Sequence, residues 1–139
     1  MQKPHKILDL WEAAMKAAQI VYRLTNSFPV NERFGLVSYM RRAAASIPRN
    51  IEKATARKGN GEFRNSLALA QDSLSELDTQ LDLALRLGYI EKGEVEELLE
   101  LLTRVANMFA PLICSPSEKE IDSFIDDLAA SDLQHASEF

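Results

Sequence analysis

Residues 41–57 read RRAAASIPRNIEKATAR, and this stretch decides the fold. Its apolar positions Ala44, Ile47, Ile51 and Ala54 are spaced by three, four and three residues, which is the period of an amphipathic helix. The small residues between them allow a neighbouring helix to approach closely. The basic residues lie mostly off this apolar seam. The stretch therefore predicts a packed helix that carries a cationic outer face.

The same alternation of three and four residues extends along most of the chain. It predicts helices over residues 6–27, 32–58, 62–87 and 91–113. The expected seam positions are Ile7, Trp11, Ala14, Ala18, Val21, Thr25 and Phe28; Val37, Met40, Ala44, Ile47, Ile51 and Ala54; Phe63, Leu67, Ala70, Leu74, Leu77, Leu81 and Ala84; and Val95, Leu98, Leu102, Val105, Phe109 and Leu112. Leu8, Met15 and Tyr22 are expected to widen the first seam, whereas Ser66, Ser73 and Gln80 form a polar strip for close packing.

Turn residues separate these segments. Pro29 ends the first helix, and Asn31 is the expected N-cap of the second. Residues 58–61, KGNG, form the clearest stop, and Gly88 ends the third helix. Because the apolar pattern continues in register beyond Pro48, this proline predicts a kink and not a break.

The fold class that follows is all-α: an antiparallel up-down-up-down four-helix bundle with a short C-terminal helix. Residues 1–114 form the bundle domain, and residues 115–139 form a short helix and a flexible tail. Ser117 and Glu120 have capping-box spacing before the apolar residues Ile121, Phe124, Ile125 and Leu128.

Composition indicates a soluble globular protein. The chain has 139 residues, of which 46% are hydrophobic and 27% charged, with one cysteine and no apolar run of membrane-spanning length. We expect a cytoplasmic protein without a signal sequence or membrane contact. The net charge of −5 conceals an asymmetry, since residues 1–64 carry 12 Lys and Arg against 5 Asp and Glu. Such a division fits either an anionic partner or basic helices packed beside acidic ones.

The sequence offers little for catalysis. His5 and His135 lie near the two ends, no Glu-x-x-His motif is present, and Cys114 has no cysteine partner. The KGNG segment lacks the phosphate-loop pattern. We therefore expect no catalytic residue, metal, cofactor or small-molecule substrate. The remaining enzymatic alternative is that the carboxylate pairs Asp72–Glu76 and Asp78–Asp82 are buried beside a pocket.

The basic face of the second helix is the candidate functional site. Cations one or two helical turns apart can follow a phosphate backbone, and arginine adds bidentate geometry. An alternative for Arg41 and Arg42 is ion pairing with Asp72, Glu76 or Asp78. The predicted nucleic-acid-binding residues are Arg41, Arg42, Arg49, Lys53, Arg57 and Lys58.

Three quoted stretches carry a resemblance to a known family. They are YRLTNSFPVNERFGL, RRAAASIPRNI and the pattern F-x-x-S-L-A-x-A-x-x-S-L-x-E-L-x-x-Q-L-x-L-A-x-x-L-G-Y. Together they resemble the bacterial four-helix bundle proteins of the 23S rRNA intervening-sequence family. The resemblance implies a homopentamer, and a related group of bundle proteins acts as a nucleic-acid-binding accessory to a reverse transcriptase. The family commonly has Ala-Glu-Gly where this chain has Glu52, Lys53 and Ala54, so the outer face is more basic here.

Three functions are compatible with the sequence. The leading prediction is a non-enzymatic oligomer that binds RNA or a nucleic-acid–protein assembly through the second helix. The second is a structural or adaptor protein, in which these cations form inter-subunit salt bridges and a protein is the partner. The third is a small-molecule enzyme, which requires buried carboxylates near Asp72 and Glu76.

Overall fold

The computed structural model describes residues 2–56 and 60–113, and their side chains over residues 7–56 and 61–112. These residues form four α-helices and two short 3-10 helices, with no strand among them. The elements are α1 (Gln2–Thr25), η1 (Val30–Glu32), α2 (Leu36–Thr55), α3 (Asn60–Arg86), η2 (Lys92–Val95) and α4 (Glu96–Ile113). The protein is therefore all-α over its described part.

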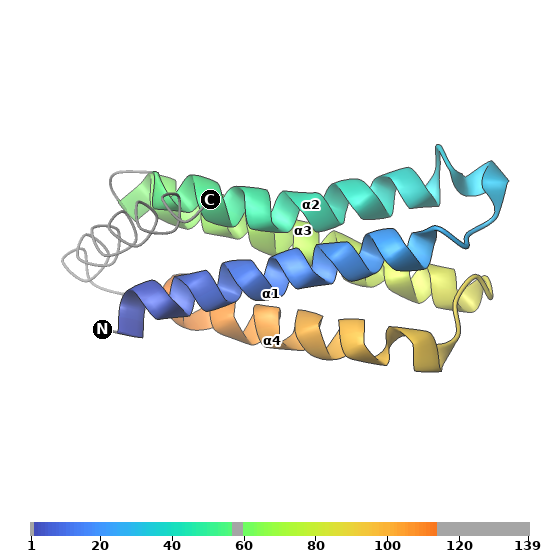
Figure 1. The fold of residues 1–139 in the computed structure, drawn as a ribbon. Helices are drawn as coiled ribbons and strands as arrows, with labels where there is room; N and C mark the ends of the chain where they lie inside the picture. The colour runs from blue at the N-terminus through green and yellow to red at the C-terminus, as the bar shows by residue number, and fades with distance from the viewer. Residues whose placement is uncertain (1, 57–59, 114–139) are drawn as a thin grey trace, which may run out of the picture.

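The four α-helices lie lengthwise beside one another (Figure 1). The α1–α2 and α3–α4 connections lie at one end, whereas the start of α1 and the end of α4 lie at the other. The most extensive packing joins α2 to α3, and α1 contacts both α2 and α4. Contacts between α3 and α4 close the arrangement around a single apolar core.

The predicted seams form this core. Every seam position predicted for α2, α3 and α4 is buried. In α1, Trp11 and Ala18 are only partly buried. The predicted widening of the α1 seam was wrong, since Met15 and Tyr22 are exposed and Leu8 is only partly buried. Because α1 packs between α2 and α4, its buried stripe extends on the opposite flank instead, through Leu10, Ala13, Ala17 and Ile20.

The start of α2 also differs from the prediction. The helix begins at Leu36 with Gly35 as N-cap, after η1, and Asn31 does not cap it. Glu32 supplies the acceptor at the helix start, because its Oε1 accepts a hydrogen bond from the backbone N–H of Leu36 at 3.2 Å. A Cβ on Gly35 would lie 2.9 Å from this oxygen, so glycine permits the approach. Carboxylate acceptors satisfy the free N–H groups at a helix start.

The Glu32 carboxylate also joins the two connections at this end of the molecule. Its Oε2 accepts a hydrogen bond from the Tyr89 hydroxyl at 2.7 Å, and the rings of Tyr89 and Phe28 lie 5.4 Å apart between centroids. This hydrogen bond raises the pKa of Tyr89, with smaller contributions from desolvation and from the Glu32 charge. The α1–α2 and α3–α4 connections are thus held together by a polar contact and an aromatic one.

Pro48 is buried inside α2, and the helix continues through it without a break, as predicted. The Asn50 amide spans the turn that contains Pro48 and donates to the carbonyl and to the Oγ of Ser46, both at 2.9 Å. Ser73 of α3 donates to the same Oγ at 2.7 Å. Ser73, the middle residue of the α3 polar strip, therefore packs against a neighbouring helix as predicted, and its buried hydroxyl is satisfied there.

The two ends of the α3–α4 connection have recognisable caps. Gly88 has a φ of +78°. Its N–H donates a hydrogen bond to the carbonyl of Leu85, and the N–H of Tyr89 donates one to the carbonyl of Ala84. These bonds form the Schellman motif that the sequence position of Gly88 indicated. Beyond it, Glu91 and Glu94 form a reciprocal capping box around η2, and α4 begins at Glu96 rather than at the predicted residue 91.

Several predictions lie outside the described residues. They are the short helix expected after Ser117, the tail, and the side chains of Arg57 and Lys58. Within the described part, none of the helices combines the length and apolarity of a membrane span.

Replacing Ile47 by alanine tests the α2 seam. Ile47 is 1% exposed, so Ile47→Ala should lower the free energy of unfolding by about 2–5 kcal/mol through lost burial and a cavity. Urea denaturation followed by circular dichroism measures this change. Val30→Ala, at a position 80% exposed, is the control and should change stability by less than about 0.5 kcal/mol. Equal losses in both variants would contradict the core assignment.

A pair of glycine substitutions separates backbone strain from packing. A Cβ at Gly88 or at Gly61 would meet no atom within 4 Å, but only Gly88 has a positive φ. Gly88→Ala should therefore destabilise the protein by about 1–2 kcal/mol. Gly61→Ala, within helical α3, should stabilise it by about 0.5–1 kcal/mol. Thermal unfolding of both variants would refute this account if the two shifts had the same sign.

Candidate nucleic-acid interface

Three of the predicted site residues share the exposed side of α2. Arg42, Arg49 and Lys53 are all exposed, and seven and four residues separate them along the helix. At a rise of 1.5 Å per residue, these spacings correspond to about 10 Å and 6 Å. No salt bridge involves these three residues within the described part of the chain. They form a line of cations available to an external anion, which we call the basic line.

Arg41 has a different role. It is partly buried, and its Nε donates to Thr25 Oγ1 at 2.9 Å. Its Nη2 donates to the Tyr22 carbonyl at 3.2 Å and to Asn26 Oδ1 at 3.0 Å, and its guanidinium carbon lies 4.7 Å from the centre of the Tyr22 ring. A cation at the C-terminal end of α1 also interacts favourably with the helix dipole. Arg41 thus fastens α2 to the end of α1.

The predicted pairing of Arg41 and Arg42 with α3 carboxylates is not what the chain forms. Arg41 binds α1, and the Arg42 guanidinium lies 5.8 Å from the centre of the Tyr39 ring on its own helix. Two ion pairs that the described residues form are Lys16–Glu97 at 3.8 Å and Arg86–Asp82 at 3.4 Å. Although α2 packs closely on α3, these two arginines lie off the face that makes that contact.

Beside the basic line, α1 and α2 enclose a groove of about 630 Å³, which we call the α1–α2 groove. Arg49 and Lys53 line it together with Glu52, and Pro48 lines it from the same helix. Its apolar lining from α1 includes Trp11, Met15 and Ala18. The groove therefore combines an apolar surface with two cations.

Sequence reasoning missed the place of Trp11. The seam pattern assigned it to the core. In the fold, Trp11 is partly buried and lines the α1–α2 groove with Arg49 and Lys53. No local signal distinguishes this position, because the neighbour of a seam residue depends on how α1 is rotated against α2.

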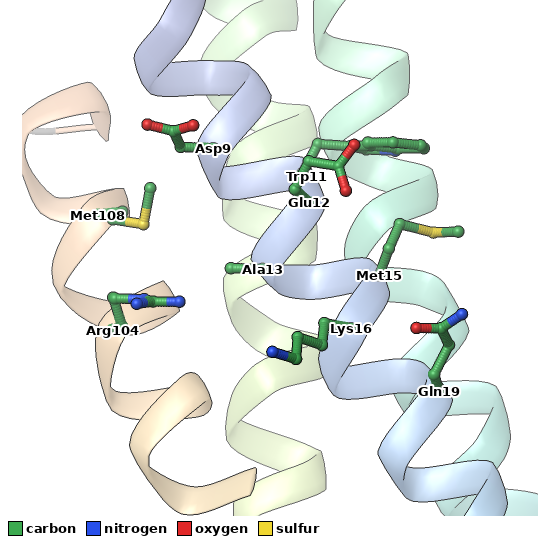
Figure 2. A pocket seen from close by; sticks show the side chains of 9 residues that line it. All are labelled: Asp9, Trp11, Glu12, Ala13, Met15, Lys16, Gln19, Arg104 and Met108. Carbon is green, nitrogen blue, oxygen red and sulfur yellow. The ribbon is translucent and has the colours of Figure 1, made fainter. Parts of the chain in front are cut away.

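A second groove lies on the other side of α1, toward α4 (Figure 2). It has a volume of about 720 Å³ and mixes both signs of charge. Asp9, Glu12 and Lys16 project from α1, and Arg104 projects from α4. Lys16 also pairs with Glu97. This groove lacks the concentrated positive charge of the outer side of α2.

The carboxylate pairs do not form an acid–base site. Asp72, Glu76, Asp78 and Asp82 are all exposed, and none of them lines either groove. Asp78 has a raised pKa because neighbouring atoms partly desolvate its carboxyl group, although its side chain reaches the surface. Among the described residues, no group of three or more His, Cys, Asp or Glu is placed to hold a metal ion.

The comparisons with known proteins agree with the resemblance seen in the sequence. The model of the 23S rRNA-intervening sequence protein family matches residues 6–110. The chain belongs to this family. Among curated proteins, no relative matches it.

A solved structure shows the same fold. It comes from Bacteroides thetaiotaomicron and is described as a protein with unknown function from the S23 ribosomal protein family. The TM-score is 0.71 at 22% sequence identity, and the match covers 79% of this chain and 99% of that one.

Alanine substitutions at two adjacent arginines test the division of roles. Arg41→Ala removes three hydrogen bonds at the α1–α2 contact and should lower the free energy of unfolding by about 1–3 kcal/mol. Arg42→Ala is the matched control and should change it by less than about 0.5 kcal/mol, since its side chain is exposed. Chemical denaturation measures both, and equal effects would contradict the assignment.

Proposed function

We propose that this protein is a non-enzymatic, cytoplasmic, oligomeric bundle protein that binds RNA, alone or within a nucleic-acid–protein assembly. One observation carries the proposal: Arg42, Arg49 and Lys53 line the exposed side of α2 without an acidic partner in the described chain. The proposal also includes Arg57 and Lys58, the two cations that directly follow Ala56 in the sequence. Arg41 supports it by holding α2 against α1.

The binding would be electrostatic and largely independent of sequence. Phosphate contacts release counterions and position a nucleic acid without reading its bases. The one-turn and two-turn spacings of the basic line allow its cations to contact phosphates along one strand. The family name, which refers to a sequence within 23S rRNA, favours RNA as the nucleic acid to test first.

The architecture we propose is the antiparallel up-down-up-down bundle, assembled as a homopentamer as the family resemblance implies. Support comes from the order of helix contacts and from apolar side chains that are exposed along α3 and directly after its last residue, Arg86. Leu69, Leu83 and Leu87 are 46%, 47% and 49% exposed. Such residues are suited to a contact between subunits.

The second candidate function is a structural or adaptor role. The exposed carboxylates of α3, among them Asp72 and Glu76, favour it, because they could face the basic line of a neighbouring subunit. In that assembly the cations would serve subunit contacts, and the partner would be another protein. Nucleic-acid binding would then be absent.

Salt-dependent RNA binding tests the proposal. Fluorescence anisotropy with a 20-nucleotide single-stranded RNA should give a slope of log Kobs against log salt near −2, from three phosphate contacts at about −0.7 each. Arg42→Glu/Arg49→Glu should weaken binding and reduce the slope by about 0.7 for each lost contact, or about 1.4 for the two. Arg23→Glu/Arg104→Glu changes the net charge equally at exposed positions away from the basic line and should retain the wild-type slope.

The mass of each sample, measured by light scattering, separates the two candidate functions. RNA binding is supported if the α2 variant keeps the wild-type mass and loses affinity. If wild type does not bind RNA and the α2 variant dissociates into monomers, the basic line holds subunits together and the adaptor role replaces the proposal. If both double variants lose affinity equally, the effect is one of net charge, and the assignment to α2 is wrong.

A further inference from the structure

Two exposed tyrosines lie against arginines of α2, and the two pairs differ. The guanidinium carbon of Arg41 lies 4.7 Å from the centre of the Tyr22 ring, and that of Arg42 lies 5.8 Å from the centre of the Tyr39 ring. Tyr22 and Tyr39 are 46% and 55% exposed. Arg41 is held by three hydrogen bonds to the end of α1, whereas Arg42 is exposed and forms no salt bridge within the described part of the chain. The second pair therefore combines an exposed ring with an available cation.

Tyr39 lies on the same side of α2 as the basic line. Three residues separate it from Arg42, and Arg49 and Lys53 follow after seven and four more. At about 100° per residue, the four positions lie within a sector of about 80° around the helix axis, and they extend over about 21 Å along it. An aromatic ring therefore lies at one end of a line of three cations.

Acidic residues flank this line on both sides. Glu52, the acidic residue of α2, lies about 140° from Tyr39 around the helix axis and lines the α1–α2 groove. On the other side, Ser73 joins α3 to α2, and Glu76 is exposed three residues further along α3. Both carboxylates repel a polyanion, so its favourable path follows the exposed side of α2 between them and passes Tyr39.

We propose that this surface binds single-stranded RNA, with an unpaired base stacked on the Tyr39 ring and neighbouring phosphates on the basic line. Proteins that bind single strands without reading their sequence combine a basic track for the backbone with aromatic side chains on which bases stack. The bases of a duplex are paired and stacked on one another, so they are not open to a side chain in this way. This inference rests on the proposed function and specifies the form of RNA that the site takes.

The preference for a single strand is measured by fluorescence anisotropy on the full-length protein at low salt. The two probes are an unstructured RNA strand of about 20 nucleotides and the RNA duplex of the same length. A site made of cations alone should bind the duplex at least as tightly, because a duplex has the higher charge density. With a stacked base, wild type should bind the single strand at least about fivefold more tightly than the duplex, the low end of the contribution of one base. Equal or tighter binding of the duplex would overturn the inference.

Substitutions of the two tyrosines test the position of the stacked base. Tyr39→Leu keeps the apolar bulk and removes the aromatic face, so it should weaken binding of the single strand about fivefold or more. The salt slope should stay at the wild-type value, since no phosphate contact is lost. Tyr39→Phe retains the ring and should bind as wild type does. Tyr22→Leu is the matched control, because it changes the same residue type at a similar exposure beside an arginine that the fold already holds, and it should leave affinity unchanged.

A strand without bases separates stacking from a change in the protein surface. An abasic strand of the same length carries the same phosphates, so wild type and Tyr39→Leu should bind it with equal affinity. A difference between the two proteins on this probe would mean that Tyr39→Leu disturbs the basic line itself, which would overturn the assignment of stacking to Tyr39. Circular dichroism of each variant confirms that the helices are retained.

The outcomes also separate this inference from the proposed function. If wild type binds RNA with the expected salt slope but Tyr39→Leu binds the single strand equally well, stacking at Tyr39 is wrong and the electrostatic function remains. If Tyr22→Leu weakens binding as much as Tyr39→Leu does, the loss is not specific to the ring beside the basic line, and the inference is again wrong. If wild type binds neither form of RNA at low salt, the proposed function fails and the inference fails with it.

Discussion

The packing of α2 on α3 is the constraint on which the rest of the structure depends. It is the most extensive helix contact, and both helices bury small side chains in the core, such as Ala44 and Ala54 of α2 and Ala70 of α3. The hydroxyls of Ser46 and Ser73 meet at 2.7 Å across it, beside the turn that contains Pro48. Because the helix has a single period of 3.6 residues, the residues that pack on α3 also determine which residues of α2 lie on its exposed side.

This constraint explains why two adjacent arginines differ. Neighbouring residues on a helix are rotated by about 100°. Arg41 therefore turns toward the end of α1, where three acceptors hold it, whereas Arg42 stays on the exposed side with Arg49 and Lys53. The cations are divided by geometry into one that positions the helix and three that are available to a partner.

Much of the fold could be predicted from the sequence, because helical periodicity is a local property. The seams of α2, α3 and α4, the passage of the helix through Pro48 and the stop at Gly88 were all predicted and confirmed. The start of α2 was not predicted correctly, since Glu32 forms a hydrogen bond with Tyr89, which is 57 residues away along the chain. The additional buried residues of α1 were predicted on the wrong flank of its seam, because packing against both α2 and α4 determines which flank is buried.

The sequence by itself determined the helical class, the family and the presence of concentrated positive charge in one segment. Each of these depends on residue type and spacing alone. Only the tertiary structure decided which cations are engaged, that Trp11 lines a groove beside Arg49 and Lys53, and that Asp72 and Glu76 are exposed. Those properties depend on how one helix is rotated and placed against another, and this is set by the packing of the whole core rather than by any single segment.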